Sequence, residues 1–436
     1  MPDGHLADAI DWSSLILVSV DDHVVEPPSM FDGRLPAQYA DRAPRVAMQD
    51  GEERWVFEGA HWQNIGLNAV VGRRIEEYGV EPQQFSDMRA GCYETDARVA
   101  DMSANGVVAS MCFPTFPKFA GTFFLNGTDP ALTREVVRAY NDWHLEEWCG
   151  PHPDRFIPLG ILPLWDPPAA AAEVRRLAER GCHAVSFPEN PVPLGLPSFH
   201  STDWDPLWAA CDDTGTVVCM HFGSSSKVPI TAPDAPIEVM VTLNPYSMGY
   251  SAADLVLSGI LARYGQLTFA LSEGGMGWVP YIAERMDWVY DRHRAWTGLD
   301  LGDGVRPSEL LRTRVVKCFI SDRHGIEMRH EIGLDTITWE CDYPHSDTTW
   351  PLSPESVAAQ LDGCTRAEID AITHANAMRV FQFDPFRHRS REQSTVAALR
   401  DEARGISDDL SAPALARSGA TRGEDWQATF DRTGRL

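Results

Sequence analysis

The sequence predicts an α/β fold organised as a (β/α)8 barrel, and three observations support this. Eight short runs rich in Val, Ile, Leu and Phe recur along the chain, and a helical or inserted segment separates each run from the next. Acidic and imidazole side chains directly follow several runs, where parallel strands would open onto the mouth of a barrel. The chain has 436 residues, enough for a barrel of about 250 residues with additions.

The first strand is predicted at residues 15–20, an apolar, β-branched run that fits a buried parallel strand. It leads directly into Asp21, Asp22 and His23, and two prolines at positions 27 and 28 then stop any regular element. Side chains two residues apart on a strand leave the same face. We therefore expect Asp21 and His23 side by side and Asp22 on the opposite face. Such a pair can hold one side of a metal ion.

Residues 31–98 differ from the rest of the chain, because they are rich in Gly, Pro, Trp and charged residues. Residues 51–59 look like a strand that begins after a turn, and the segment that follows looks irregular. We expect an insertion between the first strand and its helix, large enough to roof one end of the barrel.

Seven further strands are predicted along the chain. We expect them at residues 105–114, 155–163, 183–188, 216–221, 267–273, 315–321 and 336–342. Helical segments are predicted at residues 133–148, 169–180, 204–213, 252–264, 279–296, 326–331, 354–361 and 366–381, with Thr133 as the N-cap of the first. This alternation is typical of a (β/α)8 barrel.

The last part of the chain has a different composition. Residues 14–383 are expected to form the barrel domain, whereas residues 384–436 turn charged and rich in Ser, Arg and Asp. A short helix is expected near residues 396–404. We interpret this segment as a charged tail or surface arm, of a kind that can wrap a neighbouring subunit.

Composition argues against several classes of partner. Asp and Glu number 63 against 37 Lys and Arg, a formal charge of −26 that repels nucleic acid and anionic membranes, so we expect neither as a partner. The nine cysteines are scattered and form no C-x-x-C pair, as expected for reduced thiols in a cytoplasmic protein. A basic leader region after Met1 and an apolar run of about 18 residues are both missing, so neither a signal peptide nor a membrane span is expected.

Polar residues at strand ends supply the candidate chemistry. His221 follows the fifth strand, Glu273 the sixth and Asp342 the eighth, in addition to Asp21 and His23 after the first. Two imidazoles and two carboxylates suit Zn²⁺, Mn²⁺ or a similar divalent ion, so Asp21, His23, His221 and Asp342 are the candidate metal ligands. Asp342 and Glu273 are the candidate catalytic residues. An Asp that touches both metal and substrate can act as a general base toward water or a general acid toward carbon.

Each of these residues also has an ordinary structural explanation. A strand-end carboxylate is often a loop or cap residue, and a single histidine such as His221 is more often a hydrogen-bonded structural residue than a ligand. Arg323, His293 and His345 are candidate substrate-binding residues, although His293 on a helix also fits a solvated side chain. The joint pattern of acids and imidazoles at the ends of four strands favours a functional site.

Four motifs together resemble the amidohydrolase-related family, the amidohydrolase-2 or ACMSD-like group of the amidohydrolase superfamily. They are residues 20–28 (VDDHVVEPP), 220–223 (MHFG), 273–278 (EGGMGW) and 341–345 (CDYPH), and the similarity runs from about residue 18 to residue 383. The resemblance implies a distorted TIM barrel, one divalent metal ion with zinc preferred to manganese, and a homodimer. It carries the family's metal ligands over to Asp21, His23, His221 and Asp342.

One position departs from the family pattern. Decarboxylases of this group usually have a histidine after the sixth strand, whereas this chain has Glu273. The change favours a substrate with an amine or a hydroxyl for the glutamate to hold.

Three hypotheses follow for the function of a small-molecule site. The first, implied by the resemblance, is a metal-dependent, non-oxidative decarboxylase of an aromatic or unsaturated carboxylic acid. The second is a hydrolase of an amide, lactone or ester bond that uses metal-activated water. The third is a binding or scaffold protein whose site is vestigial.

Overall fold

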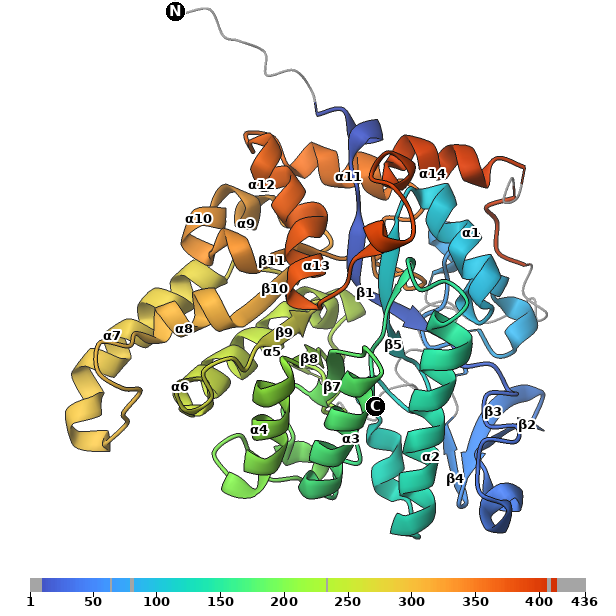
Figure 1. Cartoon of the computed structure of the whole chain (residues 1–436), viewed down its shortest axis with the longest axis horizontal. Coiled ribbons are helices and arrows are strands. Elements are labelled where there is room, and N and C mark those ends of the chain that lie inside the picture. Colours follow the sequence, from blue (N-terminus) through green and yellow to red (C-terminus); the bar gives the residue numbers. More distant parts are fainter. Residues whose placement is uncertain (1–9, 63–64, 79–81, 233, 406–408, 414–436) are drawn as a thin grey trace, which may run out of the picture.

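A barrel of parallel strands forms the centre of the computed structural model, which describes residues 10–62, 65–78, 82–232, 234–405 and 409–413. Figure 1 shows the helices arranged around these strands. The barrel strands are β1 (Val18–Val24), β5 (Ala109–Pro114), β6 (Phe156–Ile157), β7 (Ala184–Pro188), β8 (Val217–His221), β9 (Phe269–Ser272), β10 (Val315–Phe319) and β11 (Ile337–Trp339). The prediction of an α/β barrel is confirmed.

Two seams close the barrel. The strands pair in parallel in the orders β1-β5-β6 and β7-β8-β9-β10-β11. A parallel bridge between Gly160 and Val185 joins β6 to β7. At the other seam, the backbone N–H of Asp342 donates to the carbonyl of Asp21 at 2.9 Å. The second seam therefore places the polar residues of the first strand beside those that follow the last one.

Helices cover the outside of the barrel. They are α1 (Thr95–Asn105), α2 (Pro130–Trp143), α3 (Pro167–Glu179), α4 (Asp205–Thr214), α5 (Ile237–Leu257), α6 (Ile260–Arg263), α7 (Val279–Thr297), α8 (Pro307–Arg314), α9 (Arg323–Glu327), α10 (Arg329–Ile332), α11 (Ser353–Gln360), α12 (Arg366–Asp370), α13 (Asn376–Val380) and α14 (Val396–Ala403). Short π-helical turns extend α2 at His144–Cys149 and join α12 to α13 at Ala371–Ala375.

Several helix boundaries differ from the prediction. Helix α2 begins at Pro130, because the Asp129 side chain accepts the N–H groups of Ala131 and Leu132; the prediction of Thr133 as its cap is wrong. Helix α5 begins at Ile237, well before the predicted residue 252, and helices α1 and α8 were not predicted. Because α1 begins at Thr95, the last four residues of the predicted insertion, 95–98, are helical.

Side chains on each strand alternate between two cores. On β8, Val217 and Cys219 belong to the core inside the barrel, whereas Val218 and Met220 belong to the core between the strands and the helices. The same alternation directs His221 into the barrel. Almost every residue in such a strand is apolar, so the sequence does not show which side chains point inward. The two-residue alternation of the strand decides which polar side chains reach the barrel axis.

Strand β1 contains an irregularity that redirects its polar end. The strand predicted at residues 15–20 begins at Val18 and ends at Val24. Its pairing with β5 shifts register between Ser19 and Asp22. Val18 and Val20 pack inside the barrel, so strict alternation would also turn Asp22 inward. The extra residue reverses this parity, and Asp21 and His23 point inward instead.

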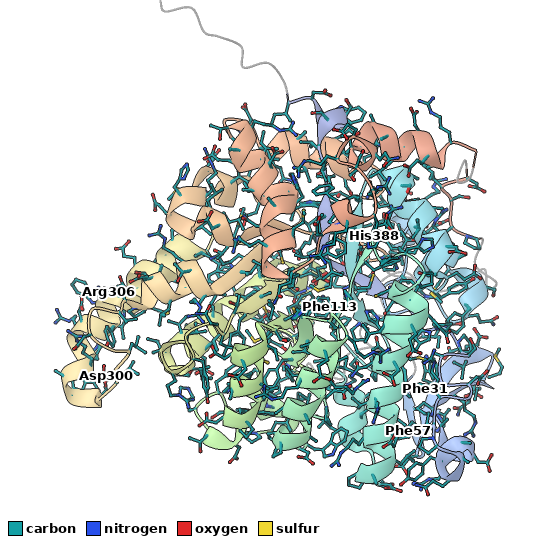
Figure 2. The ribbon with its side chains drawn as sticks, in the orientation of Figure 1. Phe31, Phe57, Phe113, Asp300, Arg306 and His388 are labelled. Carbon is teal, nitrogen blue, oxygen red and sulfur yellow. The ribbon has the colours of Figure 1, made fainter. Side chains whose placement is uncertain are left out.

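The segment between β1 and α1 carries a separate antiparallel sheet. Its strands are β2 (Arg45–Gln49), β3 (Glu52–Phe57) and β4 (Ala60–Trp62), in the order β2-β3-β4. The indole of Trp55 on β3 stacks on the ring of Phe116, which follows β5, with centroids 4.4 Å apart and planes at 9°. Figure 2 shows Phe57 at this side of the molecule and Phe113 at the barrel centre. The sheet thus packs against one of the loops at the barrel mouth.

The described part of the C-terminal segment packs on the barrel domain. Helix α14 lies beside α1 (Figure 1), its Val396 and Leu399 are buried, and the N–H of Val396 donates to the carbonyl of Leu15. Residues 406–408 and 414–436 of the predicted tail, and residues 1–9 at the N-terminus, lie outside the described residues. Within the part that is described, no helix combines the length and apolar character needed to cross a bilayer.

Candidate metal centre

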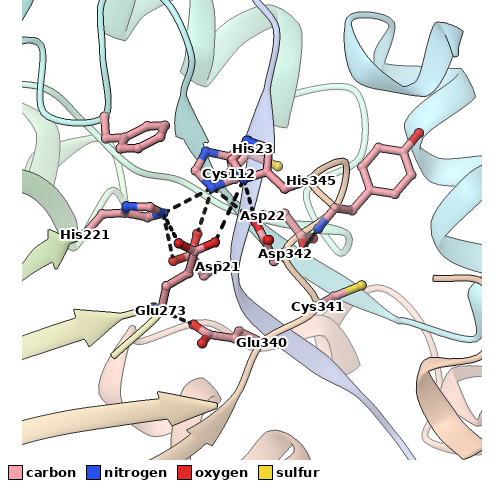
Figure 3. Close-up of polar contacts among 12 residues, drawn as sticks. Asp21, Asp22, His23, Cys112, His221, Glu273, Glu340, Cys341, Asp342 and His345 are labelled. Carbon is pink, nitrogen blue, oxygen red and sulfur yellow. Dashed lines mark hydrogen bonds and ion pairs between the residues drawn. The ribbon is translucent and has the colours of Figure 1, made fainter. Parts of the chain in front are cut away.

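Polar side chains from four strands meet inside one end of the barrel (Figure 3). Asp21 and His23 lie on β1 and His221 is the last residue of β8. Glu273 directly follows β9, and Asp342 follows β11. Asp21, His23, His221 and Asp342 are each completely buried. Since the carboxyl ends of parallel barrel strands open onto one mouth, the fold itself brings these residues together.

The four residues predicted as metal ligands are linked through His23, which lies close to each of the other three. The Nε2 atom of His23 is 3.6 Å from Oδ1 of Asp21 and 3.4 Å from Oδ1 of Asp342. The Nε2 atom of His221 is 3.2 Å from Nε2 of His23 and 3.6 Å from Oδ2 of Asp21. The two imidazoles and two carboxylates therefore direct donor atoms into one small space.

Glu273 and His345 complete the cluster. An Oε atom of Glu273 lies 3.6 Å from Nε2 of His221, and the other lies 3.9 Å from Nδ1 of His345. Nδ1 of His345 is 2.8 Å from Oδ1 of Asp342, and its ring lies 3.8 Å from that of His23 between centroids. His345, predicted as a substrate-binding residue, thus sits among the donor atoms.

The donor atoms fit a divalent cation. Both carboxylate oxygens of Asp21, both of Asp342 and Nε2 of His345 are buried, and none has a hydrogen-bond partner of normal geometry among the described residues. Burial, together with the charges of neighbouring carboxylates, raises the pKa of Asp21 and of Asp342 well above its usual range. A bound cation would satisfy these oxygens and reverse the repulsion between the acids.

The histidines are also in the form that binds a metal. Nδ1 of His221 donates to the backbone carbonyl of Phe222 at 2.6 Å, which leaves the Nε2 lone pair directed into the cluster. Burial lowers the pKa of His23 and of His221, so both rings are held neutral. A neutral imidazole is the state required of a ligand, and for His221 the hydrogen bond to Phe222 also fixes the tautomer.

A second set of contacts holds β1 against the loop that follows β11. The carboxylate of Asp22, on the opposite face of β1, accepts the N–H of Tyr343 at 2.9 Å and the hydroxyl of Ser110. The buried Arg98 guanidinium donates to the carbonyl of His23 and lies 4.2 Å from the centre of the Tyr343 ring. The predicted division of Asp21 and His23 from Asp22 is confirmed, and Asp22 supports the backbone that carries the ligands.

Sequence reasoning missed two residues at the centre. Glu340 is buried, accepts the N–H of Glu273 at 3.2 Å and the thiol of Cys318 at 2.6 Å, and burial raises its pKa to about 8. Its position two residues before Asp342 was a usable signal, because the two would share a face of the strand predicted at residues 336–342, although β11 itself ends at Trp339. The ring of Phe119 lies 4.2 Å from that of His221, and no sequence signal pointed to this contact.

Two predicted substrate-binding residues lie away from the cluster. The Arg323 side chain on α9 is 67% exposed and pairs with Glu327 one turn later. His293 on α7 is exposed and accepts the indole N–H of Trp296 at 3.0 Å. Figure 2 shows Asp300 and Arg306 near the end of the arm that α7 and α8 form, far from Phe113. Both side chains are exposed and contact a partner one turn away on the same helix, so the structure does not bring them into the cluster, and their substrate-binding role stays a prediction.

Comparison with known proteins gives a family match over most of the chain. A family model described as Amidohydrolase matches residues 32–383. Among curated proteins, the chain is similar to a gamma-resorcylate decarboxylase from Rhizobium radiobacter. The two are 24% identical over 324 residues, which cover 66% of this chain and 87% of the relative.

Solved structures show the same fold. An amidohydrolase from Mycobacterium avium subsp. paratuberculosis matches with a TM-score of 0.67 and 23% identity, covering 84% of this chain and 99% of the other. A 5-carboxyvanillate decarboxylase from Novosphingobium aromaticivorans, complexed with manganese and 4-hydroxy-3-methoxy-5-nitrobenzoic acid, matches with a TM-score of 0.60 and 16% identity. That match covers 84% of this chain and 96% of the other.

Proposed function

Because the chain belongs to the amidohydrolase family, we propose that it is a metal-dependent, non-oxidative decarboxylase of an aromatic or unsaturated carboxylic acid. One observation carries this proposal: the buried carboxylates of Asp21 and Asp342 both lie within 3.6 Å of Nε2 of His23, which in turn lies 3.2 Å from Nε2 of His221. The similarity to a gamma-resorcylate decarboxylase supports the choice of reaction.

We propose a single divalent ion held by Asp21, His23, His221 and Asp342. Zinc is the first choice, and manganese, which the 5-carboxyvanillate decarboxylase structure contains, is the second. When bound, the ion supplies positive charge that attracts a substrate carboxylate and a neighbouring oxygen. Elemental analysis of purified protein, before and after dialysis against a chelator, identifies the metal. Less than about one equivalent after reloading with either ion would contradict the proposed ligand set and favour a vestigial site.

Asp342 is the proposed proton donor. Its carboxyl group protonates the carbon that carries the substrate carboxylate, the bond between that carbon and the carboxylate then breaks, and its electron pair returns to the unsaturated system as CO₂ leaves. His345, with Nδ1 at 2.8 Å from Oδ1 of Asp342, is placed to return a proton to it. Glu273 accepts a hydrogen bond from a hydroxyl or amine of the substrate, which orients the reacting carbon.

The test is CO₂ release from a panel of hydroxybenzoates and related unsaturated acids by metal-loaded protein without an organic cofactor. The expected result is turnover of at least one acid, with the proton from solvent appearing at the carbon that lost the carboxylate. Metal-replete protein that releases no CO₂ from any member of the panel would contradict the proposal.

Hydrolysis of an amide, lactone or ester is the second candidate, and Glu273 favours it. An acid at this position, 3.6 Å from His221, can accept a proton from an attacking water as well as orient a substrate. Reaction in ¹⁸O-labelled water separates the candidates. A hydrolase incorporates one labelled oxygen into its product, whereas the decarboxylated product of the first candidate carries no label.

We propose that residues 14–383 form one catalytic domain, with residues 31–98 as an insertion that roofs the mouth. The stacking of Trp55 on Phe116 supports this role for the insertion. Residues 384–436 are proposed as a tail or arm. Because Val396 and Leu399 are buried, the part able to reach a neighbour lies beyond α14. A chain that ends at residue 405 and sediments like the full chain would rule out an assembling role for the rest of the tail.

A homodimer in the cytoplasm is also proposed. All nine cysteines lie among the described residues, are free, and fit a reducing compartment. Helices α5 and α7 contact each other and expose several aromatic side chains: Tyr246, Tyr250, Tyr281, Trp288 and Trp296. Exposed aromatic surface of this kind is typical of an interface. Sedimentation of Trp288→Glu beside the parent tests this, since an unchanged mass would exclude this face as the interface.

A further inference from the structure

Glu273 lies as close to the donor atoms of the cluster as the proposed ligands do. Its Oε2 atom is 3.6 Å from Nε2 of His221, the same distance that separates this nitrogen from Oδ2 of Asp21. Figure 3 shows the Glu273 side chain directed toward these two residues. A donor atom of Glu273 also lies within 4.8 Å of donor atoms of three further residues: His23, Asp342 and His345. Glu273 therefore contacts both sides of the cluster.

The contact between Glu273 and His221 joins two acceptor atoms. Nδ1 of His221 donates to the carbonyl of Phe222, so Nε2 of this neutral ring carries a lone pair and has no proton to donate. Oε2 of Glu273 and Oδ2 of Asp21 both face this lone pair at 3.6 Å. Three acceptors that converge in this way repel one another, and a cation among them removes the repulsion.

The distances suit ligands that share one ion. Ligand atoms about 2.0 to 2.2 Å from a divalent ion lie about 3 to 4 Å from their neighbours around it. From Nε2 of His221, the distances to donor atoms of His23, Asp21 and Glu273 are 3.2, 3.6 and 3.6 Å. Glu273 thus meets the same geometric condition as two residues already proposed as ligands.

The charge of Glu273 has no permanent cation beside it. Within the part of the chain that the structure describes, its ion-pair partners are two imidazoles, and no lysine or arginine lies within 4.0 Å. The Glu273 side chain is only 11% exposed, so water reaches little of it. Both oxygens of the completely buried Asp21 carboxylate also accept no hydrogen bond of normal geometry among the described residues. A bound ion supplies the positive charge that both carboxylates lack.

The backbone holds Glu273 in the same uncommon conformation as Asp342. Their φ angles are 52° and 59°, in the left-handed region that favours glycine. The N–H of Glu273 donates to the buried carboxylate of Glu340 at 3.2 Å, and the same carboxylate accepts the thiol of Cys318. Non-glycine residues keep such a conformation only where the surrounding structure fixes it, and they gather at functional sites. Both loops thus hold a carboxylate at the cluster in the same way.

The rest of the loop after β9 is fixed as well. The N–H groups of Met276 and Gly277 donate to Oδ2 of Asp322, which follows β10, at 2.7 and 2.6 Å. These bonds tie the loop to its neighbour in the barrel. A side chain on a loop held at both ends is preorganised to bind an ion.

We propose that Glu273 is a fifth ligand of the metal ion, which it binds through Oε2. This inference rests on the proposed function and adds one ligand to the set Asp21, His23, His221 and Asp342. The other oxygen of Glu273, 3.9 Å from Nδ1 of His345, stays available to a hydroxyl or amine of the substrate. A third carboxylate makes the centre richer in oxygen donors, which raises its affinity for manganese relative to zinc.

The direct test is a crystal structure of the full-length parent protein loaded with Mn²⁺, with the ion located by anomalous scattering. We expect an Oε atom of Glu273 within about 2.5 Å of the ion. An ion held by the other four residues, with both Glu273 oxygens beyond about 3 Å, would overturn the inference and leave the proposed centre intact. A parent protein that binds no ion would overturn both.

Competition with a chromophoric chelator tests the same ligand in solution, independently of turnover. Glu273→Gln removes the charge, whereas Glu273→Asp keeps the charge and shortens the side chain by one methylene. Asp347→Asn is the matched control. Burial and the charge of Glu273 raise the pKa of Asp347, which marks it as an acid near Glu273, yet it lies outside the donor set of the described residues. Thermal unfolding in a chelator shows that each variant is folded.

We expect both Glu273 variants to weaken Mn²⁺ binding by about 100-fold or more. This exceeds the loss of about 10- to 100-fold that is typical when a residue that only supports a ligand is changed. Zn²⁺ affinity should fall by a smaller factor, and Asp347→Asn should bind both ions like the parent.

Two results in solution would overturn the inference. The first is a Glu273→Gln protein with parental Mn²⁺ affinity. The second is a Glu273→Asp protein with parental affinity beside an Asp347→Asn protein weakened as much as Glu273→Gln, because charge alone would then explain the loss. Weakened Mn²⁺ binding by both Glu273 variants, with no CO₂ release by the parent, would support the fifth ligand and refute the proposed reaction.

Discussion

Asp342→Asn separates the two roles that we propose for this side chain, metal ligand and proton donor. The carboxylate is buried, with Oδ1 2.8 Å from His345 and 3.4 Å from His23. Asparagine preserves the shape and one ligating oxygen but cannot carry the transferred proton. A general acid contributes about 10²- to 10⁴-fold to a rate, so we expect kcat to fall by this factor, or about 3 to 5 kcal/mol in activation free energy.

The same substitution should stabilise the protein when the metal has been removed. Burial and the charge of Glu273 raise the pKa of Asp342, which means that the ionised form is unfavourable in the folded state. A neutral side chain removes this repulsion, worth about 1 to 4 kcal/mol for charges a few ångströms apart. In a chelator, Asp342→Asn should therefore unfold at a higher temperature than the parent. With metal bound, this difference in unfolding temperature should become smaller or change sign.

The assays are steady-state CO₂ release, elemental analysis and thermal unfolding with and without a chelator. Asp87→Asn is the matched control. Asp87 is a buried acid outside the cluster that accepts the backbone N–H groups of Gln83 and Gln84, so its loss should leave metal content and kcat close to the parent values. An Asp342→Asn protein that keeps parental kcat would refute the role of Asp342 as proton donor. A lower unfolding temperature in the chelator would refute the electrostatic argument.

Three further predictions concern stability. Removing the metal should lower the unfolding temperature, because ligand at 100 times its Kd contributes about 2.7 kcal/mol to the folded state; an unchanged temperature in protein shown to be metal-free would contradict this. Burial raises the pKa of Glu189 from 4.5 to about 7. The protonated side chain therefore contributes fully to the free energy of unfolding below about pH 4.5, and this contribution is lost as the pH rises through 7. In urea titrations the parent should therefore lose about 3 kcal/mol relative to Glu189→Gln over this range, and parallel pH profiles would contradict that. Trp55→Ala should cost about 3 to 5 kcal/mol, because it removes a fully buried indole stacked on Phe116, and Trp55→Phe should cost less; a loss below about 1 kcal/mol in urea would show that the stacking contributes little.

Local patterns in the sequence were sufficient for most of the fold. Buried parallel strands need continuous apolar runs, and helices need a 3.6-residue period, so both leave a mark within ten or twenty residues. The eight strands were located on this basis, and helix α7 was predicted to within one residue at its end. The start of α5 was missed because its first part, Ile237 to Tyr250, has little amphipathic contrast and contains Pro245.

The candidate ligands could be predicted because a charged side chain directly after an apolar run has no packing reason to be there. Asp21, His221 and Asp342 all carry this signal. Arg323 and His293 have suitable chemistry but no comparable constraint on direction. Whether a side chain on an outer helix faces a site or solvent depends on the rotation of that helix about its axis. The residue types at these two positions do not indicate that rotation.

By itself, the sequence determined the order of the elements, the type of fold and the kinds of donor atoms available to a metal ion, because these depend on residue type and short-range periodicity. Only the tertiary structure decided which faces meet. A register shift in β1 turns Asp21 and His23 inward. The backbone hydrogen bond from Asp342 to Asp21 joins the first strand of the barrel to the segment that follows the last strand. Both features arise from pairing between segments remote along the chain, so no local pattern records them. The order β9-β10-β11 in the sheet likewise brings Glu340 beside Glu273, whose N–H donates to the Glu340 carboxylate.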